Sequence, residues 1–502
     1  MAAGMGGPER IARQHDLGRL TIRERIAGLV DKGSFVEIGQ LAGTGSYDGG
    51  NLTGFVPDPY VAGLATVNGR DTVVAGEDFT VRGGSGSGPG QRTKRDLAFA
   101  MAREYRVPMV QFLDGAGASI ATIEKLGRSY LPNSKDWTDP LQLLGEVPMV
   151  GAVSGSVAGG VAAFALLTHW TCMAPTAELF AAGPAIVKRA LGLDVSKQEL
   201  GGMQVQVRTS GAVDNEAADE EDCFAQIVRF LSYLPQSVWQ LPPYAQPADR
   251  PDRREEELLT IVPHQSRRGY DMRRLVSLVV DEGSVFEIKP SFGRCVITAL
   301  ARMNGHAVGV VANNPMFQAG ALDAAGADKM THFMELCDTF RIPLVHFVDV
   351  PGFMIGPKAE ASGALRAGMR ALWLAHQVTV PSIAVHVRRC YGMAGTLSST
   401  PAHLGLRLGW PSGEWGSLPI EGGVETAYRR LIAEAPDPEQ ARIDLETRLR
   451  QMKSVFPIAE GFGVEDIIDP RDTRPLLIRY LEAAIPRLAH DLGPKPRYGV
   501  RP

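Results

Sequence analysis

The chain has 502 residues, of which 44% are hydrophobic and 22% charged, a balance typical of globular proteins that bury large cores. This length predicts more than one domain, because a single core rarely grows beyond roughly 250 to 300 residues. The net charge of −4 provides no basic field for a phosphate backbone, which argues against nucleic acid as a partner.

The cysteines are odd in number, widely scattered and never arranged as C-x-x-C, so they predict neither a disulfide framework nor a zinc site. We therefore expect no metal centre and a reducing, cytoplasmic location. The N-terminal sequence MAAGMGGPER lacks the basic and apolar segments of a secretory signal, which favours the same location. The cysteines are Cys172, Cys223, Cys295, Cys337 and Cys390.

The first half of the chain begins with a clear helix signal. Thr21 and Glu24 form an S/T-x-x-E capping box, followed by apolar residues at helical spacing. The dipeptide Asn68-Gly69 then predicts a hairpin between two strands. A second helix is expected over Thr93 to Arg106. It leads into VPMVQFLDGAG (residues 107–117), whose short apolar run predicts a strand buried on both faces.

The second half repeats this order about half a chain later. The pattern D-x-G-S-x-x-E-I occurs near residue 31 and again near residue 281. Asn304-Gly305 corresponds to the hairpin turn at Asn68-Gly69. A helix is expected over Lys329 to Arg341, leading into the buried strand IPLVHFVDVPGF (342–353). The repeat predicts two tandem α/β units over residues 1–250 and 251–502. They are joined by a proline-rich linker over Tyr233 to Glu257.

An uncharged stretch, VPMVGAVSGSVAGGVAAFALL (147–167), has the length of a membrane span. Four Gly, two Ser and a Pro interrupt it, however, so we interpret it as a buried strand, a glycine turn and a core helix. We therefore expect no membrane insertion.

That glycine turn has an equivalent in the second half. Gly159-Gly160 corresponds to Gly392-Met393, and each pair follows a predicted strand and precedes a predicted helix. Such a turn presents backbone N–H groups that can bind an anion or a developing oxyanion. Glycines in turns also serve only to allow positive φ or close packing. The residues leave both interpretations open.

Other candidates are weaker. The loop GGSGSGPG (83–90) matches neither common phosphate-binding motif, and Arg92, Lys94 and Arg95 suit either a phosphate or a solvated helix face. Asp114 and Asp349 stand at strand ends before small residues, where an Asp usually caps the turn. His386 and Cys390 are interpreted as packing residues. No side-chain catalytic motif occurs, which favours catalysis through backbone dipoles.

Longer motifs occur in a fixed order: RLTIRERIAGLVDKGSFVE from Arg19, EDFTVRGGS (77–85), GPAIVKRALGLDVSKQELGG (183–202), ARMNG (301–305) and DVPGFMIGP (349–357). With these motifs the chain resembles the carboxyltransferase (β) subunits of biotin-dependent acyl-CoA carboxylases, such as propionyl-CoA carboxylase. The resemblance extends from Arg19 to about Pro475. It implies a tandem duplicated crotonase-like (ClpP/crotonase) ββα-spiral fold, with the active site between the N-half of one subunit and the C-half of another.

The resemblance also implies the chemistry. Carboxybiotin on a partner releases CO2 while one oxyanion hole holds its ureido oxygen, and the freed nitrogen takes the α-proton of an acyl-CoA. A second hole holds the thioester enolate, which attacks CO2. The family pattern implies that Gly159 and Gly160 form the acyl-CoA hole, that Gly392, Met393 and Ala394 form the biotin hole, and that substrate is bound by Gly115, Ala116, Gly117, Ala118, Thr396, Arg92 and Lys94.

Partners follow from the same resemblance. No A-M-K-M biotinylation motif occurs, and QMKS (451–454) is only a fragment of it, so a biotin carboxylase and biotin carboxyl carrier subunit is expected. A dimer-based homo-oligomer, a hexamer, is expected too. The family's D-S-G-G-A-R is DGAGAS here, ending at Ser119, its Y-G-G-A-Y is YGMAG, its acyl-pocket Asp is Thr396 and the His of its G-G-x-x-x-H is Gln206. These departures leave the acyl group open. Two alternative functions also stay open: a biotin-dependent acyl-CoA decarboxylase subunit, and a CoA-binding scaffold without transfer activity.

Overall fold

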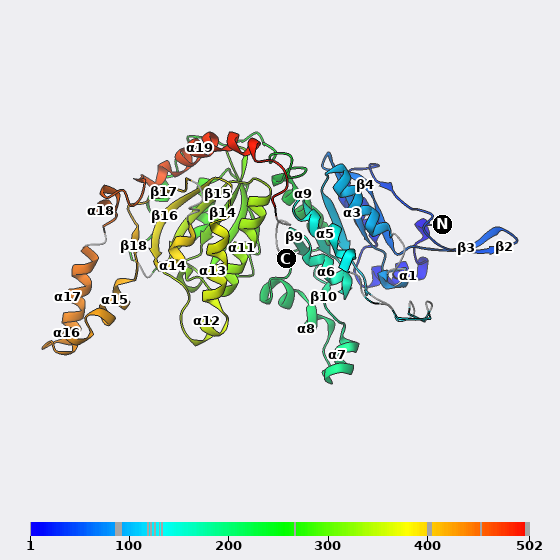
Figure 1. The fold of residues 1–502 in the computed structure, drawn as a ribbon, viewed down its shortest axis with the longest axis horizontal. Helices are drawn as coiled ribbons and strands as arrows, with labels where there is room; N and C mark the ends of the chain where they lie inside the picture. The colour runs from blue at the N-terminus through cyan, green and yellow to red at the C-terminus, as the bar shows by residue number, and fades with distance from the viewer. Residues whose placement is uncertain are drawn as a thin grey trace. The chain divides into compact units, whose positions relative to one another are not determined.

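The chain forms two units in the computed structural model (Figure 1). Unit 1 comprises Met1–Pro243 together with the C-terminal tail from Leu492, and unit 2 comprises Tyr244–Asp491. Each unit is described by itself. The structure describes residues 2–85, 93–117, 120, 123–124, 127–129, 131, 134–265, 268–398, 404–451 and 454–496.

Unit 1 is built on a seven-stranded sheet in the order β1-β4-β5-β6-β7-β9-β11. β1, β4 and β5 are antiparallel, and the following strands run parallel to β5. The strands are β1 (Val36–Glu37), β4 (Tyr60–Val67), β5 (Arg70–Glu77), β6 (Met109–Leu113), β7 (Met149–Val153), β9 (Trp170–Met173) and β11 (Asn215–Glu216).

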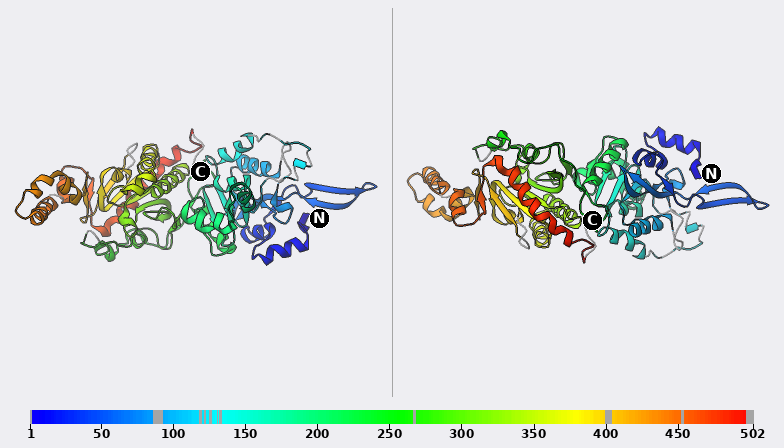
Figure 2. Two further views of the ribbon diagram at one scale, coloured as in Figure 1. Left: turned by 90° about the horizontal axis from the view of Figure 1, so that it is seen from below. Right: turned by 90° about the horizontal axis from the view of Figure 1, so that it is seen from above.

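Two smaller strand pairs complete unit 1. β8 (Ser156–Ala158) follows β7 directly in the chain and pairs in parallel with β10 (Glu178–Phe180), which follows β9. The antiparallel ribbon of β2 (Gly43–Asp48) and β3 (Asn51–Pro57) extends away from the rest of unit 1, as the blue ribbon in Figure 2 shows.

Helices cover both faces of this sheet. α3 and α6 pack on one face, where Phe99 and Phe164 meet with ring centroids 5.7 Å apart, and α2 and α9 pack on the other, where Phe224 meets Phe112 of β6. The helices are α1 (Pro8–Asp16), α2 (Ile22–Leu29), α3 (Lys94–Tyr105), α5 (Thr138–Leu143), α6 (Gly160–Leu166), α7 (Pro184–Leu191), α8 (Lys197–Gly201), α9 (Glu220–Tyr233), the π-helix η4 (Gln204–Thr209) and the 3₁₀ turns η1 (Ala2–Gly4), η2 (Arg82–Gly84) and η3 (Ser134–Trp137).

Unit 2 repeats the same sheet. Its strand order is β12-β13-β14-β15-β16-β17-β19, with β18 paired to the end of β16. β12 to β14 are antiparallel and the remaining pairs are parallel. The strands are β12 (Phe286–Ile288), β13 (Val296–Met303), β14 (His306–Asn313), β15 (Leu344–Val350), β16 (Ser382–Tyr391), β17 (Leu406–Gly409), β18 (Glu414–Gly416) and β19 (Asp466–Ile467).

Helices also cover both faces of the sheet of unit 2. α10 and α19 bury apolar residues against one face of the sheet, and α11 lies on the opposite face, where Cys337 and Phe333 approach Gly309 of β14. The helices are α10 (Met272–Val279), α11 (Ala324–Thr339), α12 (Pro357–Ala361), α13 (Ala364–Ala375), α14 (Gly392–Gly395), α15 (Ile420–Ala427), α16 (Arg429–Ala433), α17 (Pro438–Gln451), α18 (Val455–Glu460), α19 (Thr473–Ala484) and the 3₁₀ turns η5 (Glu256–Leu259), η6 (Gln318–Gly320), η7 (Thr396–Ser398), η8 (Pro470–Asp472) and η9 (Ile485–His490).

Several local predictions are confirmed. Thr21 and Glu24 form the expected capping box at the start of α2. The dipeptides Asn68-Gly69 and Asn304-Gly305 join antiparallel strands, with φ of 49° and 74° in the first and 46° and 81° in the second. Positive φ at both central residues is the backbone of a type I′ turn, which explains the choice of Asn-Gly.

The two repeated strands are buried as expected, since every residue of β6 and of β15 is buried. The uncharged stretch at residues 147–167 forms β7, β8 and α6, so it contains two strands, in different sheets, in place of the one predicted, and a helix that follows the glycine turn. Within the described part of the chain, every helix is too short or too polar to span a bilayer.

One helix boundary was predicted wrongly. The repeat placed the start of the second-half helix at Lys329, but α11 begins at Ala324, where the side chain of Asp323 caps it by accepting a hydrogen bond from the Gly326 amide. The first turn, AAGAD, contains only small residues and one Asp, so it carries no apolar periodicity that marks a helix start. The helix therefore starts at its cap and not at its first strongly periodic residue.

Candidate active site

The first glycine turn lies between β8 and α6. Gly159 has φ 62° and ψ −131°, and Gly160 is the first residue of α6. The Gly159 amide donates to the Phe180 carbonyl at 3.3 Å, whereas the first amides of α6 have no acceptor inside the helix. A Cβ added at Gly160 has no heavy atom within 4 Å. The turn therefore leaves open space where a side chain of residue 160 would stand.

The loop after β6 lies against this turn. Ala158 donates its amide to the carbonyl oxygen of Gly115 at 2.9 Å. Gly117 has φ 78°, and a Cβ there would lie 2.7 Å from the carbonyl oxygen of Ala158 and 3.5 Å from the Cα of Gly159. Only glycine permits this approach of two backbones. The structure thus brings together two groups that the sequence predicted separately.

The other residues of unit 1 that are predicted to bind substrate lie in different surroundings. Ala116 belongs to the same loop and donates its amide to Gly83 at 2.9 Å. The Lys94 ammonium lies 3.6 Å from a carboxylate oxygen of Glu37, and burial lowers the pKa of Lys94. Its partner is thus a carboxylate within the unit. Arg92, Ala118 and Ser119 lie outside the described residues.

The equivalent turn of unit 2 follows β16. Gly392 has φ 58° and opens the short helix α14, so the amides of the turn are again those of a helix start. Met393 lies inside α14 with ordinary backbone geometry and a side chain that is 50% exposed. Ala394 is buried, and the Thr396 hydroxyl donates to the Met393 carbonyl at 2.7 Å.

A cavity of about 290 Å³ adjoins this second turn. His386 stands on its wall, and burial lowers the pKa of His386 to about 4, so the imidazole is neutral at physiological pH. The wall also carries Cys390, whose thiol pKa burial raises to about 11. The complete lining is His386, Cys390, Gly392, Gly395, Thr396, Ser398, Arg407, Trp415, Gly416, Ile458, Gly463 and Val464.

The expectation that Asp114 caps its turn is wrong. Its Oδ2 accepts hydrogen bonds from Arg25 Nη1 at 2.9 Å and from Gln14 Nε2 at 3.0 Å. Arg25 also pairs with Glu220, and the two carboxylates raise the pKa of Arg25 although burial opposes them. Asp114 therefore holds α2 to the end of β6 through a buried ion pair.

Asp349 likewise does not cap its turn. Its Oδ2 accepts from Arg388 Nη2 at 2.8 Å and its Oδ1 accepts from Arg389 Nε at 2.6 Å. Asp349 is fully buried, and the two arginine side chains are 2% and 12% exposed. One carboxylate thus compensates two arginines at the strand ends just before the Gly392 turn.

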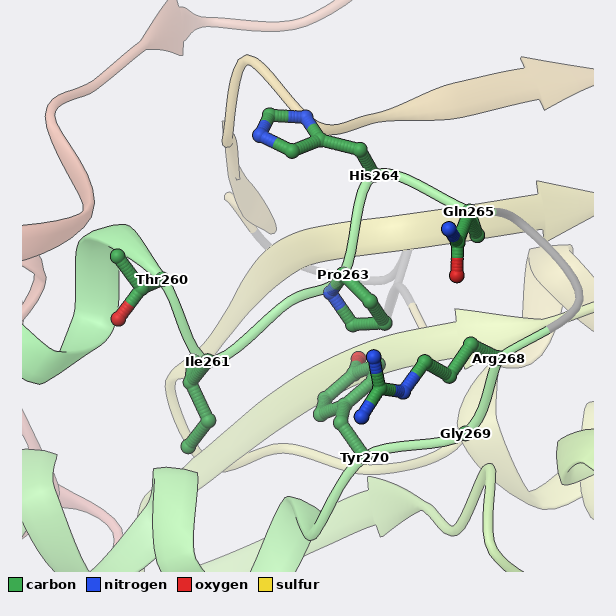
Figure 3. A pocket seen from close by; sticks show the side chains of 8 residues that line it. All are labelled: Thr260, Ile261, Pro263, His264, Gln265, Arg268, Gly269 and Tyr270. Carbon is green, nitrogen blue, oxygen red and sulfur yellow. The ribbon is translucent and has the colours of Figure 1, made fainter.

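A second, larger cavity of about 470 Å³ is lined by residues between Thr260 and Tyr270 (Figure 3). Tyr270 and Arg268 stand on its wall, together with His264. The Arg388 guanidinium lies 4.8 Å from the centre of the Tyr270 ring, and it donates to the Arg268 carbonyl at 2.9 Å. Arg388 therefore contacts both the wall of this cavity and the carboxylate of Asp349.

The sequence analysis assigns no role to Arg25 or Arg388. The position of each among apolar residues nevertheless indicates that it needs a partner inside the fold. Arg25 follows the capping box on the face of α2 that also carries the buried Ile22 and Ile26. A charged residue on the buried face of a helix requires a partner inside the fold. Arg388 and Arg389 interrupt an otherwise apolar strand in the same way.

Comparisons with known proteins agree with this fold. The carboxyl transferase domain family matches residues 13–495. The propionyl-CoA carboxylase carboxyltransferase subunit of Haloferax mediterranei is 35% identical over 482 residues, covering 94% of this chain and 92% of that protein. The methylmalonyl-CoA decarboxylase subunit alpha of Veillonella parvula is 32% identical over 480 residues, covering 95% and 92%.

Among solved structures, the chain is similar to the hexameric transcarboxylase 12S core with methylmalonyl-coenzyme A bound. The TM-score is 0.87 at 32% identity, over 96% of this chain and 93% of that one. The crotonase-like fold predicted for the duplicated halves is thereby confirmed. The chain belongs to the carboxyl transferase domain family and is a carboxyltransferase of the biotin-dependent acyl-CoA carboxylase type.

Proposed function

We propose that the chain moves CO2 from carboxybiotin on a partner subunit to the α-carbon of an acyl-CoA, and that each half supplies one oxyanion hole. The observation that carries the proposal is the matched pair of glycine turns. Gly159-Gly160 and Gly392-Met393 end equivalent strands of the repeat, and both open a helix. A reaction that develops negative charge on two carbonyl oxygens in succession needs two such sites.

The roles of the residues follow from their backbone. The Gly159 and Gly160 turn holds the thioester oxygen as it becomes an enolate, with Gly115, Ala116 and Gly117 as its neighbouring wall. In unit 2, the turn of Gly392, Met393 and Ala394 faces the ureido oxygen of biotin. Residues 1–250 then form the acyl-CoA side and residues 251–502 the biotin side.

The residues present suit both substrates. No heavy atom lies within 4 Å of the point where a Cβ of Gly160 would stand, which leaves room for a thioester on that side of the turn. The Gly392 turn adjoins a cavity whose wall carries the neutral imidazole of His386 and the ring of Trp415, which suits the uncharged ring system of biotin. Ala118, Arg92, Lys94 and Thr396 remain proposed substrate contacts.

The assembly is proposed on the same basis. We infer a biotin carboxylase and biotin carboxyl carrier partner, and a hexamer built from dimers, from the likeness to a transcarboxylase core described as a hexamer. Light scattering of the purified chain measures the subunit number. The cysteines of the described residues are free thiols, which suits the proposed cytoplasmic location.

Transfer can be tested without the partner. Methylmalonyl-CoA and free biotin, incubated with the purified chain, should yield propionyl-CoA, detected by chromatography, because the reaction is reversible. Omitting biotin should abolish the release. A protein that binds acyl-CoA but releases none under these conditions is the scaffold of the alternative hypothesis.

One specific observation favours the decarboxylase alternative, namely the 32% identity to a methylmalonyl-CoA decarboxylase subunit. It uses the same transfer in the opposite direction. The neighbouring reading frames discriminate: a biotin carboxylase with an AMKM carrier supports carboxylation, whereas a membrane sodium pump subunit supports decarboxylation.

A further inference from the structure

A buried ion pair in unit 1 adjoins the loop that borders the proposed acyl hole. Glu77 is the last residue of β5 and is 2% exposed. Its carboxylate accepts a hydrogen bond from the Asp114 amide at 3.1 Å. Asp114 directly follows β6 and precedes the Gly115–Gly117 loop. Glu77 therefore holds the backbone at the point where this loop begins.

The side chain of Glu77 also packs against the loop. A Cβ added at Gly115 would lie 3.1 Å from Cγ of Glu77 and 3.2 Å from Cγ2 of Val161, which belongs to α6. Gly115 is thus enclosed between Glu77 and the helix that Gly160 opens. Its carbonyl also accepts from the Ala158 amide at 2.9 Å, just before the glycine turn. In such a closely packed arrangement, a shift of the loop also moves the turn.

Arg95 of α3 completes the ion pair. Its guanidinium binds the other carboxylate oxygen of Glu77. The same guanidinium lies 4.7 Å from the centre of the Tyr60 ring and 4.5 Å from the centre of the Phe164 ring. Because Phe164 belongs to α6, the pair connects this helix to the loop after β6. These are the two elements that border the proposed acyl hole.

The charges of the pair depend on each other. Burial raises the pKa of Glu77, and the positive charge of Arg95 opposes this effect. Burial acts to lower the pKa of Arg95, but the negative charge of Glu77 is the main cause that leaves it raised. Removal of either charge would therefore leave the other buried without a partner, which is costly unless the group moves toward water.

We propose that Glu77 and Arg95 are positioning residues for the acyl hole, because their ion pair fixes the Gly115–Gly117 loop against α6. The inference deepens the proposed function and rests on it, since it concerns the hole that is assigned to the thioester. Neither side chain acts on the thioester itself. Glu77 acts through the Asp114 amide and the loop, and Arg95 acts through Phe164.

Reverse transfer from methylmalonyl-CoA to free biotin tests this role with the purified full chain. Glu77→Gln keeps an oxygen that can accept from the Asp114 amide, but it leaves Arg95 without a counter-charge. We expect kcat to fall about tenfold or more and the dissociation constant of CoA to change less than about threefold, because small displacements at a reacting centre mainly affect the rate. The double variant Glu77→Gln, Arg95→Met should regain most of the lost kcat, since it removes both charges.

Asp281→Asn is the matched control. Asp281 is also buried, and it accepts hydrogen bonds from the amides of the Asn304-Gly305 turn and from Arg474. This turn precedes β14, whereas the Gly392 turn follows the end of β16, and both strands run parallel to β15. The control should lower the free energy of unfolding in urea, as Glu77→Gln does, but keep kcat within about twofold of the wild-type value.

Hydrogen exchange measured by mass spectrometry tests the positioning without any transfer. Glu77→Gln should speed exchange in residues 109–117 and 160–166, and Asp281→Asn should not, because only Glu77 contacts these segments. If the wild-type chain transfers nothing, the proposed function fails, while exchange in these segments still decides whether the ion pair positions the loop.

Three results would overturn the proposal. The first is a folded Glu77→Gln variant with unchanged exchange and a kcat within about twofold of the wild-type value. The second is an equal loss of kcat in Glu77→Gln and Asp281→Asn, which would reflect stability alone. The third is an effect of Glu77→Gln confined to the Michaelis constant for methylmalonyl-CoA, which would assign Glu77 to substrate binding.

Discussion

Asp349 accepts a hydrogen bond from Arg388 at 2.8 Å, and both side chains are at most 2% exposed. Asp114 makes the equivalent pair with Arg25 at 2.9 Å in the other half. The duplicated strand therefore ends in each unit at a buried carboxylate that binds arginine. The partners differ between the halves, since Arg25 comes from a helix and Arg388 from the neighbouring strand.

Asp349→Asn should reduce the free energy of unfolding by about 3 to 5 kcal/mol, because Arg388 and Arg389 would remain buried without a counter-charge. Urea denaturation measures the change. Asp328→Asn is the control, since its pair with Arg370 is half-exposed and should contribute about 1 kcal/mol or less. Equal effects of the two substitutions would contradict the structural role of Asp349.

His346 and His386 should make the fold sensitive to acid. Burial lowers the pKa of each to about 4, against about 6.5 when unfolded. Besides burial, Arg407 and His346 lower the pKa of His386, and Glu465 raises it. The unfolded chain therefore binds protons first as the pH falls.

Stability from these two histidines is complete above pH 6.5 and is lost as the pH falls toward 4. Each should contribute about 2 kcal/mol to the loss between pH 7 and pH 5. The double variant His346→Gln, His386→Gln should flatten the dependence of the unfolding free energy on pH in that range. If the double variant keeps the same dependence of unfolding free energy on pH, groups other than these two histidines cause the loss of stability in acid.

Gly160→Val tests the proposed acyl hole. The position has normal φ and free space for a Cβ, so the variant should fold, and circular dichroism checks this. A β-branched side chain should displace the thioester from the amides and lower kcat about a hundredfold or more, while CoA affinity largely survives. Near wild-type transfer by a folded variant would move the acyl hole to the Gly115–Gly117 loop.

Met393→Gly tests the Met that replaces the family's Gly in the second glycine turn. A Met amide is the same donor as a Gly amide, and Met393 adopts an ordinary backbone conformation. We expect transfer to free biotin to change less than about tenfold, because the half-exposed side chain only narrows the approach. An increase of several orders of magnitude would indicate a degenerate turn and support the scaffold hypothesis.

The carrier prediction concerns residues 451–454, of which Met452 and Lys453 lie outside the described residues. Since QMKS is only a fragment of the biotinylation motif, the purified chain should give no streptavidin signal. It should also fail to carboxylate any acyl-CoA from bicarbonate and ATP. Covalent biotin on Lys453, detected by mass spectrometry, would refute the need for a partner carrier.

The sequence by itself determined the duplication and most of the local structure. The capping box at Thr21 and the Asn-Gly turns at residues 68 and 304 form as predicted. Each depends on the backbone preferences of residues at most a few positions apart. Burial of β6 and β15 followed from their continuous apolar runs in the same way.

Only the tertiary structure decided what the charged residues do. Arg25 meets Asp114 across 89 positions, and Arg388 meets Asp349 across 39. No local preference encodes such pairs, because they form only when a helix and strands pack and remove both charges from water. The approach of Gly117 to Ala158 and the cavity beside Gly392 depend on folding for the same reason, since segments distant in sequence enclose them.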